Sequence, residues 1–354
     1  MNARVAAVLL VLLVVLGGTA LIYQREDRQR RPSNAASLGQ VLFKDLKAAD
    51  IASIRIAEAK NVLTLERKDE RWTLAERGGF PADFARVREF VLKAIELKAG
   101  QSEPIGEKDR ARLNLDDSGT QIDFRGAGGK PLGTLIIGKK YFKREVENPA
   151  KAIGDGRFVL QPADPKIVYL VADPLIQATA KTGEWIERAA FQAEKVKTLE
   201  VKFPEGGGYR IERNADNADW KLAGSKPGEK LDISKANAAS YSLSLLDLAD
   251  VLPNDTKDTG LDKPAEITAV TLDGLTYSIK VGKLQGDNYF TTFTSSGTIK
   301  PDAKDAERSK KLEERQPRER MLQNYVLLIP KGRLEDTLKK RPEFLEKRED
   351  KKKK

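Results

Sequence analysis

The sequence predicts an α+β protein in which an N-terminal transmembrane helix precedes two tandem repeated β-rich units. Each unit is expected to combine a β-meander and a hairpin in one sheet with a packed amphipathic helix. Three observations support this fold class. An uncharged apolar run extends from Val5 to Tyr23, apolar residues then alternate as they do in half-buried strands, and the same succession of elements returns about 145 residues later.

The apolar run at residues 5–23 is long enough to cross a bilayer as a single helix. At about 1.5 Å per residue it reaches roughly 28 Å, close to the ~30 Å thickness of the hydrocarbon core. A cleaved signal peptide is the alternative, because Gly18-Thr19-Ala20 resembles a cleavage site. The apolar residues continue through Tyr23, past that site, which favours a membrane anchor at residues 1–24 in contact with lipid.

The charges that follow the anchor leave its orientation open. The polar linker at residues 25–41 begins with Arg25, Arg28, Arg30 and Arg31, a flank that the positive-inside rule would place in the cytoplasm. Long domains behind a signal-like segment are nevertheless translocated largely regardless of charge. A periplasmic body is therefore physically allowed.

The composition limits the chemistry available to the folded body. The chain has 354 residues, of which 40% are hydrophobic and 33% charged, and it contains no His and no Cys. This absence removes the commonest general base, the commonest metal ligand and the thiol nucleophile, and it excludes disulfides. We predict no metal, no cofactor and no catalytic residue; an enzyme would have to use carboxylates, Lys, Tyr or Ser.

The formal net charge of +10 raises the question of nucleic-acid binding. Acidic residues are interleaved with the basic ones, and a basic tail at residues 347–354 supplies part of the excess. The clearest basic run that includes aromatic residues is Lys139–Arg144, which we interpret as a solvated loop after a hairpin. We therefore predict no nucleic-acid partner.

The first β-rich unit is predicted over residues 42–190. Its meander begins at Ile54 and Ile56 and ends at Trp72, which we interpret as a core residue covering one face of the sheet. Asp83 is expected to cap a helix whose apolar face consists of Val87, Phe90, Val91, Ala94 and Ile95. A hairpin over residues 122–137 and strands at 158–160 and 167–171 are expected to complete the unit.

The second unit is predicted over residues 195–346 and repeats this order. Leu199 and Val201 correspond to Ile54 and Ile56, and Trp220 corresponds to Trp72. Its helix is expected to bury Ala238, Tyr241, Leu245, Leu246 and Ala249. The hairpin returns at residues 267–272 and 277–281, and a final strand is predicted at 325–329. A charged insertion at about 300–322 is expected to form an exposed helix broken at Pro317.

Several short motifs carry a family resemblance. They are Ile54 to Ile56, Glu66-Arg67, Trp72-Thr73-Leu74 and Pro81-Ala82-Asp83. In this order they resemble the bacterial domain-of-unknown-function family 4340. The second unit departs from the pattern, with Lys230-Leu231-Asp232 where the first has Pro-Ala-Asp.

The resemblance implies a membrane-anchored accessory component of ABC-type transport systems, some of them linked to gliding motility. It implies a single-pass protein of the bacterial inner membrane with a periplasmic body. The implied partner is an ABC permease or its auxiliary subunit. The resemblance carries over no catalytic or cofactor-binding residue.

Three further motifs resemble functional sites, but in each case the surrounding residues favour a structural interpretation. Gly133 to Lys139 matches the start of a phosphate-binding loop, but Lys140 replaces the Ser or Thr that would bind magnesium, so we predict no nucleotide. Gly206-Gly207-Gly208 is interpreted as a hairpin turn, because a strand follows it. The pairs Asp116-Asp117 and Glu313-Glu314 are interpreted as solvated, because adjacent side chains diverge.

These observations predict a non-enzymatic binding protein of the cell envelope, with its binding residues unassigned. One alternative is a purely structural spacer, and the other is an envelope hydrolase or glycan-modifying enzyme. Such an enzyme would need two carboxylates, distant in sequence, that converge in one cleft at roughly 5 to 10 Å.

Overall fold

The computed structural model describes residues 38–300 and 306–346. The anchor predicted at residues 1–24, most of the linker and the basic tail lie outside the described residues. Among the described residues, no helix combines the length and the apolar character that crossing a membrane requires. The chain divides into two compact units, one made of residues up to 75 and 82–184, the other of residues 76–81 and 185 onward.

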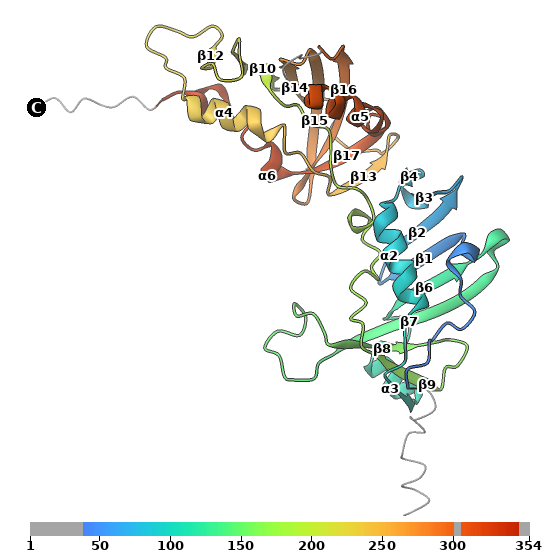
Figure 1. Cartoon of the computed structure of the whole chain (residues 1–354). Coiled ribbons are helices and arrows are strands. Elements are labelled where there is room, and N and C mark those ends of the chain that lie inside the picture. Colours follow the sequence, from blue (N-terminus) through green and yellow to red (C-terminus); the bar gives the residue numbers. More distant parts are fainter. Residues whose placement is uncertain (1–37, 301–305, 347–354) are drawn as a thin grey trace, which may run out of the picture. The chain divides into compact units, whose positions relative to one another are not determined.

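A nine-stranded antiparallel sheet has the order β4-β3-β2-β1-β6-β7-β8-β9-β5, and all of its strands except the edge strand β4 lie in the first unit (Figure 1). Its strands are β1 (Ser53–Glu58), β2 (Asn61–Lys68), β3 (Arg71–Leu74), β4 (Phe80–Pro81), β5 (Gln101–Pro104), β6 (Thr120–Arg125), β7 (Pro131–Tyr141), β8 (Gly156–Leu160) and β9 (Ile167–Val171). The helices of the first unit are α2 (Phe84–Ile95) and α3 (Glu107–Arg112), and short 3-10 turns lie at Ala48–Asp50, Ala127–Gly129 and Thr182–Glu184.

Helix α2 begins where the sequence predicts. The side chain of Asp83 accepts hydrogen bonds from the backbone N–H groups of Ala85 and Arg86, at 2.9 and 3.2 Å, and so satisfies donors that a helix start leaves free. The predicted apolar face is confirmed except at Ile95, which is half-buried. Phe90 of this face stacks on Phe124 of β6 with 6.2 Å between ring centroids, which packs the helix on the sheet.

The second unit contains an eight-stranded antiparallel sheet with the order β12-β11-β10-β14-β15-β16-β17-β13. Its strands are β10 (Val196–Lys202), β11 (Gly208–Glu212), β12 (Lys221–Leu222), β13 (Asp250–Pro253), β14 (Ala265–Thr271), β15 (Leu275–Gln285), β16 (Asn288–Gly297) and β17 (Tyr325–Pro330). Its helices are α4 (Ile233–Ser242), α5 (Ala306–Leu322) and α6 (Lys331–Leu334), with 3-10 turns at Ala75–Arg77 and Arg341–Phe344.

The two sheets share one topology. The order β3-β2-β1-β6-β7-β8-β9-β5 in the first is matched strand for strand by β12-β11-β10-β14-β15-β16-β17-β13 in the second. In both units a helix follows the first three strands in sequence and precedes a strand at the edge of the sheet. Helix α2 precedes β5, and helix α4 precedes β13. Trp72 and Trp220, on or next to the third strand, are both buried.

Matching glycines mark the same irregularity in both sheets. The pairing register shifts near Gly138 in β7 and near Gly282 in β15. A Cβ on Gly138 would lie 2.2 Å from the carbonyl oxygen of Leu113, and a Cβ on Gly282 would lie 2.2 Å from that of Thr259. Only glycine permits so close a backbone approach.

We expect Gly138→Ala and Gly282→Ala to lower the free energy of unfolding by about 1–3 kcal/mol each, because the added methyl group overlaps a carbonyl oxygen. Hydrogen exchange of the amides in β7 and β15 measures the loss in each unit separately. Gly332→Ala is the control, since nothing lies within 4 Å of its added Cβ. Losses confined to one of the two units would contradict the equivalence of the two positions.

The expected face of the second helix is wrong. Helix α4 ends at Ser242, and it buries Ala236, Ala239 and Ser240, with Leu243 directly after it. Tyr241 is 64% exposed and Leu245 45% exposed. The predicted apolar stripe extends past the end of the helix. The buried residues of α4 lie at the same distances in sequence from its N-cap Asp232 as the buried residues of α2 do from Asp83.

The charged insertion also differs from its prediction. Helix α5 continues through Pro317 without a break. Pro317 is exposed, whereas Leu312, Glu319 and Leu322 are buried. The buried face of the helix packs on the rest of the unit and keeps the helix continuous, although Pro317 cannot donate a backbone hydrogen bond.

Candidate functional site

A groove beside helix α2 in the first unit is lined largely by apolar side chains. It has a volume of about 360 Å³ and is called here the α2 groove. Phe84 and Leu92 are 60% and 42% exposed, although they lie on the same helix as the buried core face. The groove is lined by Ala48, Ala49, Arg67, Glu70, Trp72, Phe84, Val87, Arg88, Val91 and Leu92.

A second pocket lies at the equivalent place in the second unit. It has a volume of about 540 Å³ and is called here the α4 pocket. Counted from the two N-caps, Ser240 and Tyr241 of this pocket take the places of Val91 and Leu92 in the α2 groove. Its lining consists of Ala193, Glu194, Lys195, Arg213, Asp216, Asn237, Ala238, Ser240, Tyr241, Ser244 and Arg308.

Arg213 fixes one wall of the α4 pocket. Its guanidinium carbon lies 4.6 Å from the centre of the Trp220 ring, a cation–π contact. Its Nε donates to the carbonyl oxygen of Val196 at 2.8 Å, and its Nη2 donates to Oδ1 of Asp216 at 2.8 Å. The indole Nε1 of Trp220 donates to Oδ1 of Asn237 at 2.9 Å. This wall is therefore held in one arrangement before any ligand binds.

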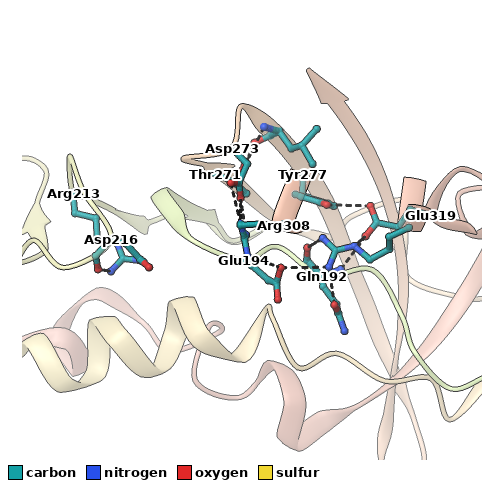
Figure 2. A network of polar contacts seen from close by, with 11 residues as sticks. Gln192, Glu194, Arg213, Asp216, Thr271, Asp273, Tyr277, Arg308 and Glu319 are labelled. Atoms are coloured by element: carbon teal, nitrogen blue, oxygen red, sulfur yellow. Dashed lines mark hydrogen bonds and ion pairs between the residues drawn. The ribbon is translucent and has the colours of Figure 1, made fainter. Parts of the chain in front are cut away.

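Arg308 of α5 fixes the opposite side. It forms a bidentate ion pair with Asp273, with Nη2 and Oδ2 2.7 Å apart, and its Nη1 lies 3.3 Å from Oε2 of Glu194 (Figure 2). Arg315 also reaches that Glu194 oxygen, at 3.5 Å. Both arginines are largely buried, so these charge-assisted contacts are only weakly screened.

The same network continues to a buried carboxylate. Glu319 is 3% exposed; its Oε1 lies 2.9 Å from Nε of Arg315, and its Oε2 accepts from the hydroxyl of Tyr277 at 3.0 Å (Figure 2). Burial raises the pKa of Glu319, although Arg315 opposes that rise. Burial also raises the pKa of Tyr277. The pair connects α5 to β15 and holds the charged helix on the sheet.

An adjoining pocket of about 450 Å³ brings part of this network to the surface. Glu194, Arg308 and Arg315 line it together with Gln192, Glu307, Lys311 and Leu312. Glu319 lines neither this pocket nor the α4 pocket. The carboxylate with the raised pKa is thus placed to support the helix and is out of reach of a substrate in either pocket.

The carboxylate pairs singled out in the sequence lie apart from these pockets. Asp116 accepts from the backbone and hydroxyl of Ser118, and these hydrogen bonds lower its pKa. Glu314 forms an exposed ion pair with Lys310 one helical turn away, at 3.8 Å. Across residues 38–300 and 306–346, no group of three or more Asp or Glu side chains is arranged to hold a metal ion.

The phosphate-loop and basic motifs are structural in this fold. Residues 133–139 lie inside strand β7, where converging backbone amides are not available. Lys140 caps a loop by donating to the carbonyl oxygens of Ala150 and Ala152, at 2.9 and 2.7 Å. Gly206 to Gly208 form the predicted hairpin turn between β10 and β11, all with positive φ.

Sequence reasoning missed the residues that build the α4 pocket. Arg308 and Arg315 lie in the insertion interpreted as exposed, and Glu194 lies between the predicted units. A partial signal existed, because Arg315 and Glu319 are four residues apart and so face the same side of a helix. Asp273, the partner of Arg308, and Tyr277, the partner of Glu319, come from a distant hairpin. Sequence patterns do not show that this hairpin lies against the helix.

Comparison with known proteins gives one match. The family model described as "Domain of unknown function (DUF4340)" matches residues 72–264, from strand β3 of the first unit to the residue before β14 of the second. No curated protein and no solved structure matches the chain. Because the family model covers more than half of the sequence, the chain belongs to the DUF4340 family.

Proposed function

We propose that this chain is a membrane-anchored, non-enzymatic accessory protein that binds a protein partner in the bacterial cell envelope. Residues 1–24 form its single-pass anchor in the inner membrane, and the units proposed over 42–190 and 195–346 arose by tandem duplication and face the periplasm. The partner is an ABC-type permease or its auxiliary subunit. The apolar run at residues 5–23, the family resemblance and the matching strand orders support this proposal.

The observation that carries the binding function is the α2 groove. Phe84 and Leu92 expose apolar surface next to the buried side chains of Val87 and Val91. Exposed apolar side chains that lie together do not stabilise the fold and are typical of a binding surface. Arg67, Arg88 and Glu70 border this apolar surface and are exposed, so two of its three charged neighbours are basic. An amphipathic segment of the partner, apolar on one side and acidic at its edge, has the complementary chemistry.

We expect Leu92→Asp to abolish co-purification of the partner with the full-length protein from crosslinked membranes, because a carboxylate cannot be buried in an apolar contact without a partner. Recovery should fall by about tenfold or more. Leu284→Asp is the matched control, since Leu284 is 41% exposed in the second unit and lies outside the groove. Equal recovery with Leu92→Asp and wild type would rule out the groove as the docking site.

We rank the carboxylate enzyme second. Glu194 and Glu319, which are distant in sequence, both contact Arg315 beside a described pocket. Each is neutralised by arginine, and Glu319 is buried away from the pockets. Release of new reducing ends from cell-wall glycan by the purified protein, lost in Glu194→Gln, would reverse this ranking.

A further inference from the structure

The α4 pocket and the α2 groove have the same framework but different chemistry. At matched helix positions, Arg88, Val91 and Leu92 in the groove are replaced by Asn237, Ser240 and Tyr241 in the pocket. The first unit shows that the fold tolerates apolar side chains at two of these positions. The fold itself therefore does not demand polar groups at these positions, and of the two side chains in the second unit Tyr241 is exposed.

Most of the charged side chains around the α4 pocket are paired with one another. Arg213 is paired with Asp216, and Arg308 is paired with Asp273 and Glu194. A charged ligand would have to compete with these ion pairs for its counter-charge. The lining instead favours an uncharged ligand that can both donate and accept hydrogen bonds.

Side chains at the pocket hold positions suited to such a ligand. Asn237 uses its Oδ1 to accept from Trp220, and within the described part of the chain its amide NH₂ group has no hydrogen-bond partner. Asp216 keeps its orientation through Arg213, and its side chain is 54% exposed. Planar amide and carboxylate groups, each fixed by a neighbour, can bond two adjacent hydroxyl groups without losing side-chain entropy.

An exposed aromatic ring completes the pocket. Tyr241 is 64% exposed on α4, and the hydroxyl of Ser244 donates to its carbonyl oxygen at 2.7 Å. A tyrosine ring offers a flat apolar surface with low entropy cost on binding. A flat apolar surface beside hydrogen-bonding groups is complementary to a sugar ring, which presents C–H groups on its face and hydroxyl groups at its edge.

We propose that the α4 pocket binds one or two sugar units of a neutral carbohydrate. The ring of Tyr241 packs against the C–H face of the sugar, and Asn237 and Asp216 bond its hydroxyl groups. The pocket volume of about 540 Å³ lies in the range of small-molecule sites. The sugar site is independent of the protein partner proposed for the α2 groove. One of these two proposals can therefore be disproved while the other stands.

Isothermal titration of the full-length protein with two neutral probes tests the proposal: a tetrasaccharide of N-acetylglucosamine and a tetrasaccharide of glucose. The detergent must carry no sugar headgroup, because such a headgroup would compete. We expect at least one probe to bind with a dissociation constant of about 1 mM or below, and to be recovered intact. Failure of both probes to bind at about 10 mM would overturn the proposal.

Variants test where the sugar binds. Tyr241→Ala and Asn237→Ala should each weaken binding about tenfold, because one removes the stacking surface and the other the amide donor. Both residues are exposed, but Asn237→Ala also removes the acceptor of the Trp220 indole, so hydrogen exchange in β10 and β11 must verify that each variant stays folded. Leu92→Ala, at the matched position of the first unit, should bind as wild type does. Unchanged affinity in both pocket variants would place the sugar elsewhere and overturn the assignment.

Discussion

Replacement of Glu319 by alanine is expected to destabilise the second unit by about 3–5 kcal/mol, because it leaves Arg315 buried without its closest carboxylate. The same change removes the acceptors of the Tyr277 hydroxyl and of the Gln192 backbone N–H. Native-state hydrogen exchange of the amides in β15 and β17 measures the effect within this unit. Glu314→Ala, on the exposed side of the same helix, should change stability by no more than about 0.5 kcal/mol.

The raised pKa of Glu319 adds a pH dependence to this prediction. A carboxyl group whose pKa is higher in the folded than in the unfolded protein contributes stability at low pH and loses that contribution as pH rises through the folded-state pKa. The stability difference between wild type and Glu319→Gln should therefore widen as pH falls from neutral toward the ordinary glutamate pKa of about 4.3. If the stability difference narrows as pH falls, the ion pair with Arg315 has a larger effect on the pKa of Glu319 than burial has.

Phe191→Ala is expected to cost about 3–5 kcal/mol in the second unit, through lost burial and the cavity left behind. Phe191 is fully buried and stacks on Phe293 with 4.0 Å between ring centroids and on Tyr277 with 5.9 Å. It directly precedes the segment that carries Gln192 and Glu194, so its loss should also loosen the adjoining pocket.

Chemical denaturation followed by the exchange of β16 amides checks this value. Leu245→Ala serves as the control, because Leu245 is 45% exposed and lies just beyond α4. A cost for Phe191→Ala near that of Leu245→Ala would contradict the packing of the segment on the sheet.

Much of the fold could be predicted where local signals are strong. The meander strands alternate with period two, and the cap at Asp83 starts an apolar stripe of helical period, so β1 to β3 and α2 follow from neighbouring residues. Helix α4 was misplaced because small residues such as Ala236 and Ala239 form its buried face. Their apolar signal is weaker than that of the exposed Tyr241 and Leu245.

The candidate sites depend on contacts that sequence patterns do not contain. Glu194 precedes β10, Asp273 follows β14 and Arg308 lies in α5, yet the three form one ion-pair cluster. In the sequence, the charged segment 306–322 has the composition of a solvated helix. The fold supplies the partners of its arginines: Arg308 pairs with Asp273 and Glu194, and Arg315 contacts Glu194 and Gln192.

The α2 groove also escaped prediction for a physical reason. Phe84 and Leu92 are as hydrophobic as core residues, so their hydrophobicity alone does not reveal that they are exposed in the fold. The position that matches Leu92 in the second unit carries Tyr241, which is also exposed. Comparison of the two units thus shows that both keep an exposed side chain at the position used in the two proposed binding surfaces.

Site-specific photocrosslinking in living cells tests the proposed docking function most directly. A photoreactive amino acid at position 92 of the full-length protein should give a discrete adduct with an ABC permease or its auxiliary subunit, whereas the same amino acid at position 284 should not. Equal adducts from both positions, or none from position 92 while the protein is present at its normal level, would contradict the proposal that the α2 groove binds the partner.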